Sequence, residues 1–423
     1  MEPTKSLSTS IDLTGVPLKP LPGLTQQVLP FFTFTRSLAL CPLSFESMRK
    51  KGQVNFKFKF GGALFSLCLI LALFFNLLIF IGVLKYGGLL KYDVLPGSDL
   101  WPTNSGQLYT AIDHVSGFTA GLITSISSVY VMIAPIDYFI AFLKAPKLTK
   151  WLNDWNEIED EMQQMGFSMD QIKIRKFIKY FIPLFEFGPV LAVGGFETFL
   201  RLDPKYPVHC VFIIIYASLP HICYSAGDSQ ALVMLKCLQV EFREVRAHIE
   251  KTFDGGLVQL EVRRVHLLLI KLRSQAKRCG EYLAPQQLVS ISMTIYFMGA
   301  SCFIFVSVLS DQPVWDASWL WITTSMTGAW VAYGMSRLYV KICMAVSITK
   351  EEAQIASLLK SEGLKMKFGT DYYSTELREV HTLLTTHPTE VSFNNYVTLN
   401  SSLILGVIQQ VFTHFIILMQ FRR

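Results

Sequence analysis

The chain has 423 residues, of which 51% are hydrophobic and only 17% are charged. Soluble domains carry about 25% charged residues, so this composition excludes an ordinary water-soluble globular protein. The aromatic content of 13% excludes a disordered chain, and eight scattered cysteines exclude a disulfide scaffold. A mean hydropathy of +0.38 with a net charge of +6 is typical of a polytopic membrane protein with basic connections.

Seven segments of the chain are apolar over the length of about 20 residues that a helix needs to cross a bilayer. They lack the two-residue alternation of barrel strands and are too long to be such strands. We therefore predict an all-α polytopic membrane protein with seven transmembrane helices. The predicted spans are residues 60–84, 111–142, 177–200, 209–235, 287–309, 319–340 and 393–421.

Lysine and arginine are distributed unevenly among the connections. Residues 1–59 and the second, fourth and sixth connections hold 29 of them, whereas the remaining connections and the C-terminal residues hold 6. Because cytoplasmic loops retain basic residues, we predict a cytoplasmic N-terminus and an extracellular C-terminus. This orientation is opposite to that of a G-protein-coupled receptor.

Two of the predicted cytoplasmic connections have a helical pattern of their own. The fourth span continues helically to Gly255-Gly256, after which an amphipathic pattern resumes, and the stretch after the sixth span breaks near Gly369. These helices either merely extend past the lipid or pack into an intracellular bundle that assembles several copies of the chain. The predicted units are a cytoplasmic segment 1–59, spans one to four 60–235, a cytoplasmic extension 236–286, spans five and six 287–345, cytoplasmic helices 346–392 and a last span 393–423.

Motifs for catalysis and metal binding are absent from the sequence, which has no HExxH, GxSxG or glycine-rich phosphate loop. His221 and Cys223 are two residues apart, a spacing at which side chains on a helix point in different directions. We predict that the chain is not an enzyme, needs no cofactor or metal, and does not bind nucleic acid.

Four ionisable residues are predicted near the cytoplasmic edge of their spans. Asp137, Asp228, Arg337 and Lys341 can pair with one another there or extend toward the headgroups, and a structural role is favoured.

Glu186 is predicted to lie deeper, about nine residues and roughly 14 Å into the third span. A carboxyl group at such depth usually faces the bundle interior or a wet cavity. His221 on the fourth span reaches a comparable depth, which allows a hydrogen-bonded Glu186–His221 pair. That pair is either part of a ligand site or a buried structural contact.

The outer halves of spans two to six combine aromatic rings with a few polar groups, as a small-molecule cavity requires. Each residue alone is more often a packing or interfacial residue, so only the collection favours a cavity. The candidate ligand-binding residues are Glu186, His221, Tyr216, Tyr296, Trp321, Thr324, Trp330 and His114.

The last span carries one stripe of small and polar residues on a helix that is otherwise Leu, Ile, Val and Phe. Such a stripe either packs against another helix or lines a pore, supplied once by each subunit around a central axis. Followed at helical spacing, the stripe contains Ser402, Gly406, Gln410 (or Gln409), Thr413, Ile417 (or Ile416) and Gln420.

The end of this span resembles the signature of the insect gustatory receptor family, which is Thr-Tyr, five hydrophobic residues and Gln-Phe. The matching residues run from Thr413 to Phe421, and His414 replaces the usual tyrosine. Phe393, Tyr396 and Leu399-Asn400 are also similar to the family pattern. The residue-level match covers about the last thirty positions, whereas the architectural resemblance covers the whole chain.

The resemblance implies a ligand-gated, non-selective cation channel of four subunits, related to the insect odorant receptors. The subunits would be identical or of related kinds, with the last helices lining the pore and the cytoplasmic helices forming an anchor. Carried over by position, Gln420 and Phe421 would form the extracellular-side gate, and Thr413 and Ile417 would line the path below it. Together with Gln410 of the polar stripe, these are the candidate pore and gate residues.

The family includes sugar, bitter and carbon dioxide receptors in the plasma membrane of chemosensory neurons, so a small tastant, membrane lipid and permeant monovalent and divalent cations are the implied partners. A metabotropic seven-helix receptor or a small-molecule transporter is the alternative.

Overall fold

The structure is a computed structural model that describes residues 24–50, 53–60, 63–86, 117–167, 172–195, 207–254, 260–310, 317–365 and 371–421. Helices dominate these residues, which confirms the predicted all-α class. The α-helices are α1 Leu24–Ser37, α2 Ala63–Tyr86, α4 Gly117–Gln164, α5 Ile172–Lys176, α7 Pro207–Asp254, α8 Leu260–Ser310, α9 Ala317–Lys365, α10 Asp371–Thr386 and α11 Ser401–Gln420. The remaining elements are three π-helical turns, η3 Phe177–Phe181, η4 Pro183–Phe187 and η5 Val190–Gly194, and the strands β1 Leu43–Lys50, β2 Gln53–Phe60, β3 Ser392–Phe393 and β4 Val397–Thr398.

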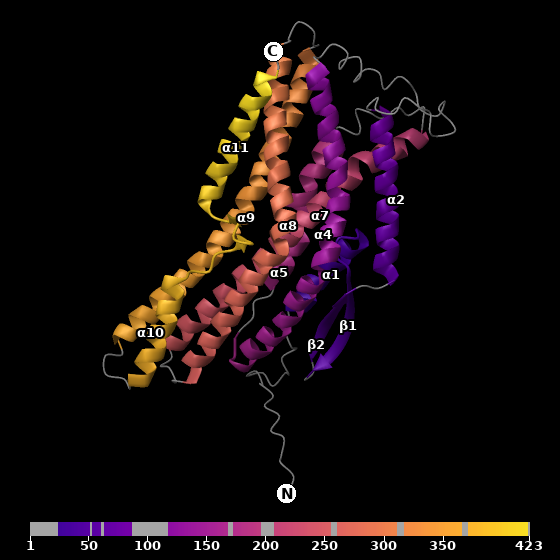
Figure 1. The fold of residues 1–423 in the computed structure, drawn as a ribbon. Helices are drawn as coiled ribbons and strands as arrows, with labels where there is room; N and C mark the ends of the chain where they lie inside the picture. Colours follow the sequence, from indigo (N-terminus) through magenta and orange to yellow (C-terminus); the bar gives the residue numbers. More distant parts are fainter. Residues whose placement is uncertain are drawn as a thin grey trace.

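The helices α4, α7, α8 and α9 are much longer than a bilayer is thick. The shortest of them have 48 residues, which corresponds to about 72 Å at the rise of an α-helix. The hydrocarbon core measures only about 30 Å, so each helix can span it and still extend well beyond. Together they form an elongated bundle with α2 at one side and α11 at the other (Figure 1). α7 ends at Asp254, directly before Gly255-Gly256.

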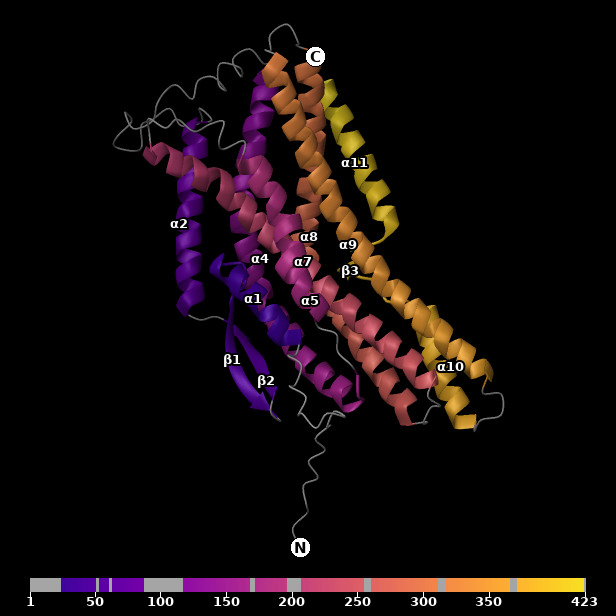
Figure 2. The same cartoon turned by 180° about the vertical axis from the view of Figure 1, so that it is seen from behind.

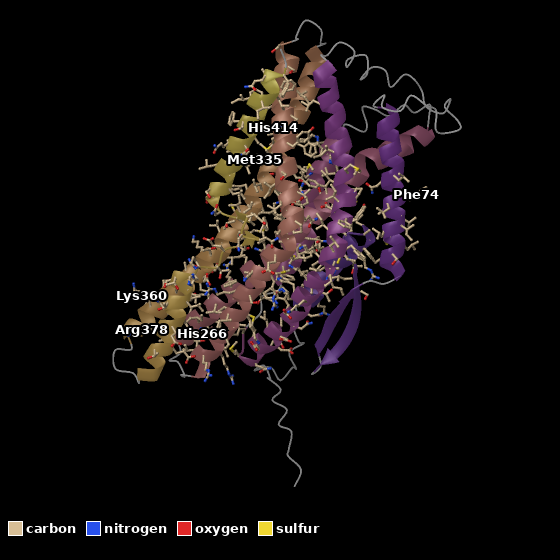
Figure 3. The ribbon with its side chains drawn as sticks, in the orientation of Figure 1. Phe74, His266, Met335, Lys360, Arg378 and His414 are labelled. Atoms are coloured by element: carbon tan, nitrogen blue, oxygen red, sulfur yellow. The ribbon has the colours of Figure 1, made fainter. Side chains whose placement is uncertain are left out.

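Three helical stretches in the described part of the chain are long and apolar enough to cross a membrane. They are Val262–Ser307, Gly328–Ser361 and Ser401–Gln420. Each overlaps one of the last three predicted spans. In Figure 3, Lys360, Arg378 and His266 lie near one end of the bundle, and His414 lies toward the other end.

Two small antiparallel hairpins interrupt the helical architecture, and neither was predicted. In the first, β1 pairs with β2 from Leu43 opposite Phe60 to Lys50 opposite Gln53. In the second, β3 pairs with β4 around a turn in which Asn394 and Asn395 have positive φ angles of 51° and 62°. Asparagine tolerates this left-handed backbone better than most residues. The predicted last span is therefore corrected, because its helix begins at Ser401 rather than at residue 393.

The end of the bundle that holds α10 has a continuous apolar core. Side chains of α1, α4, α7 and α8 meet there, and the largest of those buried completely include Trp151 and Trp155 of α4, Phe32 of α1 and Phe242 of α7. The rings of Trp151 and Trp155 lie edge to face with their centroids 5.5 Å apart. Seen from behind, α1 lies beside α4 and next to α5 in this region (Figure 2). This core fixes how the long helices are arranged before they reach the predicted membrane region.

The segment that leads into α11 is held against α8 and α9. Glu352 of α9 accepts hydrogen bonds from the backbone N–H and the hydroxyl of Thr389, the latter at 2.7 Å. Gly280 of α8 lies so close to β3 that a Cβ atom there would collide with the carbonyl oxygen of Ser392. Only glycine permits this approach, so α11 starts from a fixed point on α8.

Candidate functional site

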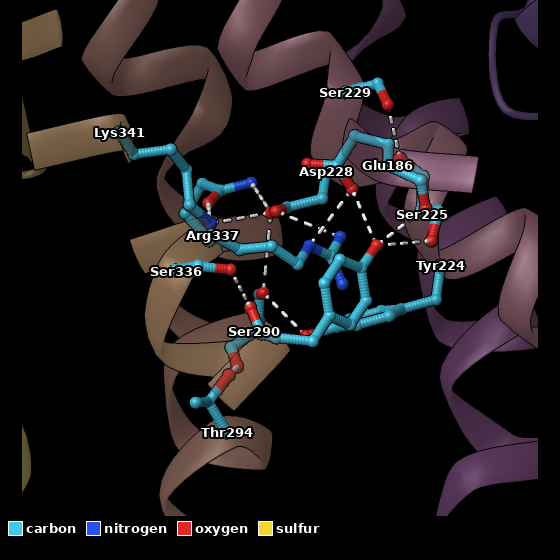
Figure 4. Close-up of polar contacts among 12 residues, drawn as sticks. Glu186, Tyr224, Ser225, Asp228, Ser229, Ser290, Thr294, Ser336, Arg337 and Lys341 are labelled. Atoms are coloured by element: carbon cyan, nitrogen blue, oxygen red, sulfur yellow. Dashed lines mark hydrogen bonds and ion pairs between the residues drawn. The ribbon is translucent and has the colours of Figure 1, made fainter. Parts of the chain in front are cut away.

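A buried cluster of charged residues joins the third predicted span to α7 and α9 (Figure 4). Arg337 of α9 lies between two carboxylates, with its Nε 3.1 Å from Glu186 and an Nη 2.9 Å from Asp228. The exposed fractions of these three residues are only 4%, 0% and 3%. Buried charges persist in proteins when they are paired in this way, so the cluster constrains how the three helical segments pack.

Lys341 extends the cluster one helical turn along α9. Its Nζ donates hydrogen bonds of 2.7 Å to Asp228 and 2.7 Å to the side-chain oxygen of Gln287 on α8. Gln287 in turn donates to Asp228 at 3.1 Å. Asp228 is therefore neutralised from two sides, and α8 is connected to the same network.

Two tyrosine rings enclose the guanidinium of Arg337. Its central carbon is 4.4 Å from the ring centre of Tyr224 and 5.1 Å from that of Tyr333, both within the range of cation–π attraction. The Tyr333 hydroxyl donates to the backbone carbonyl of Glu186 at 2.7 Å and also lies 3.2 Å from its carboxylate. Arg337 is thereby held by rings and carboxylates from three helical segments.

The π-helical backbone explains how Glu186 comes to face Arg337. Pro183 and Pro189 lack the N–H that an α-helix uses, and a proline ring collides with the carbonyl four residues earlier. The chain instead forms wider turns, in which the N–H of Gly188 donates to the carbonyl of Pro183. Such turns are frequent at functional sites because they redirect side chains.

A small polar cavity lies against the cluster, between α7, α8 and α9. Its volume is about 10 Å³, which is close to the least space that holds one water molecule. A cavity of this size has no room for an organic ligand. Its lining residues are Tyr224, Asp228, Ser290, Ile291, Thr294, Gly334, Arg337, Leu338 and Lys341.

Aromatic rings continue the cluster toward the predicted outer half. His221 of α7 stacks on Trp330 of α9 with ring centres 4.7 Å apart and planes 8° from parallel. Trp330 contacts Tyr333 at 5.9 Å between ring centres. The structure thus brings Glu186, His221 and Trp330 into one connected set of side chains, whereas the predicted Glu186–His221 hydrogen bond stays a prediction.

The other candidate ligand residues are distributed differently. Tyr296 of α8 faces His414 of α11, with ring centres 5.8 Å apart, and so lies on the side of α8 that carries α11. Tyr216 belongs to α7, and Trp321 and Thr324 belong to α9, but their side chains are outside the described set. His114 lies outside the described residues altogether.

The pairing of Glu186 with Arg337 was not predicted. Sequence position, converted into depth along straight helices, puts Arg337 at the cytoplasmic edge and Glu186 about 14 Å deeper. The wide turns of η4 and the long arginine side chain bridge that difference. The expected pairing among the other edge residues is confirmed for Asp228 with Arg337 and Lys341. The sequence feature that indicates these irregular turns is the pair of prolines, Pro183 and Pro189, on either side of Glu186.

α11 is attached to the bundle along one side only. Val407, Val411 and Leu418 are buried against its neighbours, and His414 fits against Gly299 of α8, where a Cβ atom would be 2.7 Å from the imidazole. The opposite side is exposed in the single chain. That exposed side carries all five candidate pore residues, Gln410, Thr413, Ile417, Gln420 and Phe421.

The fold is similar to solved structures of an insect receptor. The insect olfactory receptor OR5 from Machilis hrabei matches with a TM-score of 0.63 and 10% sequence identity, covering 94% of this chain and 98% of that chain. The same receptor in complex with eugenol matches with a TM-score of 0.57, 11% identity and the same coverage. Neither the protein-family models nor the curated protein sequences give a match to this chain.

These two likenesses extend over almost the whole of both chains, so they concern the complete architecture and not one shared motif. The resemblance to the insect chemosensory receptors that the signature in α11 indicated is confirmed at the level of structure. This chain has the fold of the insect olfactory receptor OR5.

Proposed function

We propose that this chain is a subunit of a gustatory receptor that acts as a ligand-gated, non-selective cation channel. The observation that carries the proposal is the free side of α11, where a polar stripe faces away from the chain's own bundle. A single chain gains nothing from exposing Gln410, Thr413 and Gln420 within an apolar helix. Four such helices around an axis would bring the stripes together as a pore wall.

The proposed ligand is a small tastant, such as a sugar or a bitter compound, bound in the outer half of the helical bundle. The stacked rings of His221 and Trp330 offer flat apolar surfaces there, and Glu186 and Tyr333 offer polar groups below them. This combination of rings and few polar groups suits burial and orientation of a small molecule. The structure of the olfactory receptor OR5 in complex with eugenol supports the idea, since that receptor binds a small molecule.

α8 provides the physical link from this region to the proposed pore. On one of its sides Gln287 and Ser290 contact Asp228 of the charged cluster. About two turns further along, Tyr296 and Gly299 contact His414 of α11. A displacement of the cluster on ligand binding would therefore move the surface on which α11 rests.

We propose that the receptor is located in the plasma membrane of chemosensory neurons, as a homotetramer or a heterotetramer with related subunits.

Cysteine substitution along α11 tests the pore assignment. Thr413→Cys is expected to lose most of its agonist current when a charged, thiol-specific methanethiosulfonate reagent is applied, because the added group would project into the ion path. Phe412→Cys is the matched control, since Phe412 is 62% exposed but lies about 100° around the same helix. Whole-cell recording before and after the reagent measures both. Equal block of the two variants, or block of neither, would remove the reason for assigning the stripe to a pore.

A further inference from the structure

A buried carboxyl group in the α10 end of the bundle has no role in the proposed channel. Glu241 of α7 is only 1% exposed, and neither of its carboxylate oxygens has a hydrogen-bond partner among the described residues. An ionised carboxylate without a partner is costly to bury, so this group requires either a nearby positive charge or a proton.

The ionisable groups around Glu241 are mostly acidic. Glu159 of α4, itself 3% exposed, acts on it from the neighbouring helix, and Glu244 acts from the next turn of α7. The buried thiol of Cys237, one turn earlier on α7, lies within the influence of Glu241 and of Cys279 of α8. Burial, followed by repulsion from Glu159 and Glu244, raises the pKa of Glu241 well above its usual range.

Several basic groups of the adjoining elements are engaged with other partners. On α7 and α5, Lys236 donates to Gln239 at 2.7 Å, Lys173 pairs with Glu244 at 3.7 Å, and Arg246 pairs with Glu351 of α9 at 2.7 Å. On α8, three basic residues pair with acids other than Glu241: Lys271 with Glu161, Arg273 with Glu352 and Arg278 with Asp154. α1 carries a single charged residue, Arg36, in its last turn and far from its first residue. The geometry thus favours the protonated form of Glu241.

Glu159 of α4 caps the N-terminus of α1. Its carboxylate accepts a hydrogen bond from the backbone N–H of Leu24, the first residue of that helix. A negative charge is favourable there, because the N-terminus of a helix carries a partial positive charge. Leu24, Val28 and Phe32 of α1 then pack into the same apolar core as Trp151 and Trp155.

We propose that Glu159 and Glu241 together control the docking of α1 on α4, and that this docking depends on a proton carried by Glu241. A proton on Glu241 lets Glu159 keep its charge at the start of the helix. Loss of that proton places a second negative charge beside the first in a dry core, and the docking of α1 on α4 weakens. On the predicted topology this pair lies on the cytoplasmic side, so intracellular pH would set how firmly the N-terminal part of the chain is held.

The direction of the effect follows from proton linkage. With α1 docked, Glu241 holds its proton to a higher pH than it does once water reaches the pair. The docked form therefore binds more protons between the ordinary glutamate pKa and the raised one, and docking weakens as pH rises through that window. One linked proton changes the docking equilibrium by at most about tenfold per pH unit.

A native cysteine reports whether α1 is docked. Cys41 follows α1, is completely buried, and has its thiol pKa raised to about 12 by burial. Its neighbour Leu40 is held by a hydrogen bond of 3.1 Å from the side chain of Gln230 on α7. Maleimide can reach Cys41 only when this region leaves the bundle. The full chain in detergent, labelled at pH 6.5, 7.5 and 8.5 and analysed by peptide mass spectrometry, gives the rate at this cysteine.

An internal reference and a control variant separate docking from thiol chemistry. Ser357→Cys places a reference thiol at an exposed site of α9, so dividing the labelling rate of Cys41 by that of the introduced thiol removes the intrinsic effect of pH. Glu250→Gln changes an exposed acid of the same helix as Glu241 and leaves the pair intact. The ratio of the two labelling rates is expected to rise severalfold from pH 6.5 to 8.5, both in Ser357→Cys alone and in Ser357→Cys combined with Glu250→Gln. This rise stays within the limit of about tenfold per pH unit.

Glu241→Gln imitates the protonated group and is expected to keep the ratio low at all three pH values. A flat ratio in the protein that retains Glu241 would overturn the proposal without any need for the variant. A rise in Glu241→Gln equal to that in Glu250→Gln would overturn it as well. The readout contains no ion current, so its outcome is independent of the proposed channel function.

Discussion

Replacing Arg337 with methionine is expected to destabilise the folded chain more than the loss of any exposed cation. The change removes the cationic partner of Glu186 in a region where that carboxylate is 0% exposed, and it takes away one of the two cations that pair with Asp228. Breaking a buried ion pair from one side costs about 3–5 kcal/mol, because the remaining charge stays buried without compensation. For a chain of 423 residues the unfolding midpoint of the purified protein in detergent should therefore fall by about 3–6 °C.

Two companion variants make this result specific. Lys350→Met removes an exposed cation of the same helix and should leave the midpoint almost unchanged. Adding Glu186→Gln to Arg337→Met neutralises the carboxylate that lost its partner, so the double variant should be more stable than the single one. The charged cluster would not determine stability if the unfolding midpoint of Arg337→Met equalled that of Lys350→Met. The same conclusion would follow if the double variant were less stable than Arg337→Met alone.

Shortening Phe421 to alanine is expected to produce current without any ligand. Phe421 ends α11 with 64% of its side chain exposed in the single chain. Four such rings near an axis would form an apolar constriction that closes by excluding water, and removing them lets water enter. Gln420→Ala, by contrast, should mainly alter the strength of gating or the ion preference, since its amide can hydrogen-bond to a neighbouring subunit.

The measurement is the holding current of cells with matched surface expression, before and after agonist. The control is Phe412→Ala, which removes an exposed ring of similar size from a different side of α11. Normal surface levels with no basal current and unchanged agonist responses in Phe421→Ala would mean that Phe421 faces lipid. The gate would then have to lie elsewhere on the helix.

The long helices could be predicted because their apolar content is a property of local sequence. The polar stripe of α11 was equally readable, since Gln410, Thr413 and Gln420 recur at helical spacing and do lie on one exposed side. The β1–β2 hairpin could also be predicted from sequence, because residues 53–60 alternate between polar and apolar positions. The prediction of a cytoplasmic segment over residues 1–59 uses only its charge and its position before the first span, and it does not draw on this alternation.

The partners within the candidate site could not be predicted from sequence alone. Glu186, Asp228 and Arg337 are far apart in the chain, and their contacts depend on helix tilt and on the wide turns of η4. The same holds for the approach of Ser392 to Gly280, which requires knowledge of how α8 runs past the start of α11. Spacing reveals which side of a helix a residue occupies, but not which neighbour that side meets.

The most direct test of the central claim is recording from membrane patches excised from cells that express this chain. An agonist is first identified by screening sugars and bitter compounds against those cells. If the chain forms the channel, the agonist evokes a cation current in patches bathed without nucleotides or G proteins, and the current persists after excision. A cellular response to the agonist that vanishes on excision, while the protein is present at the surface, would contradict the account and indicate a metabotropic receptor.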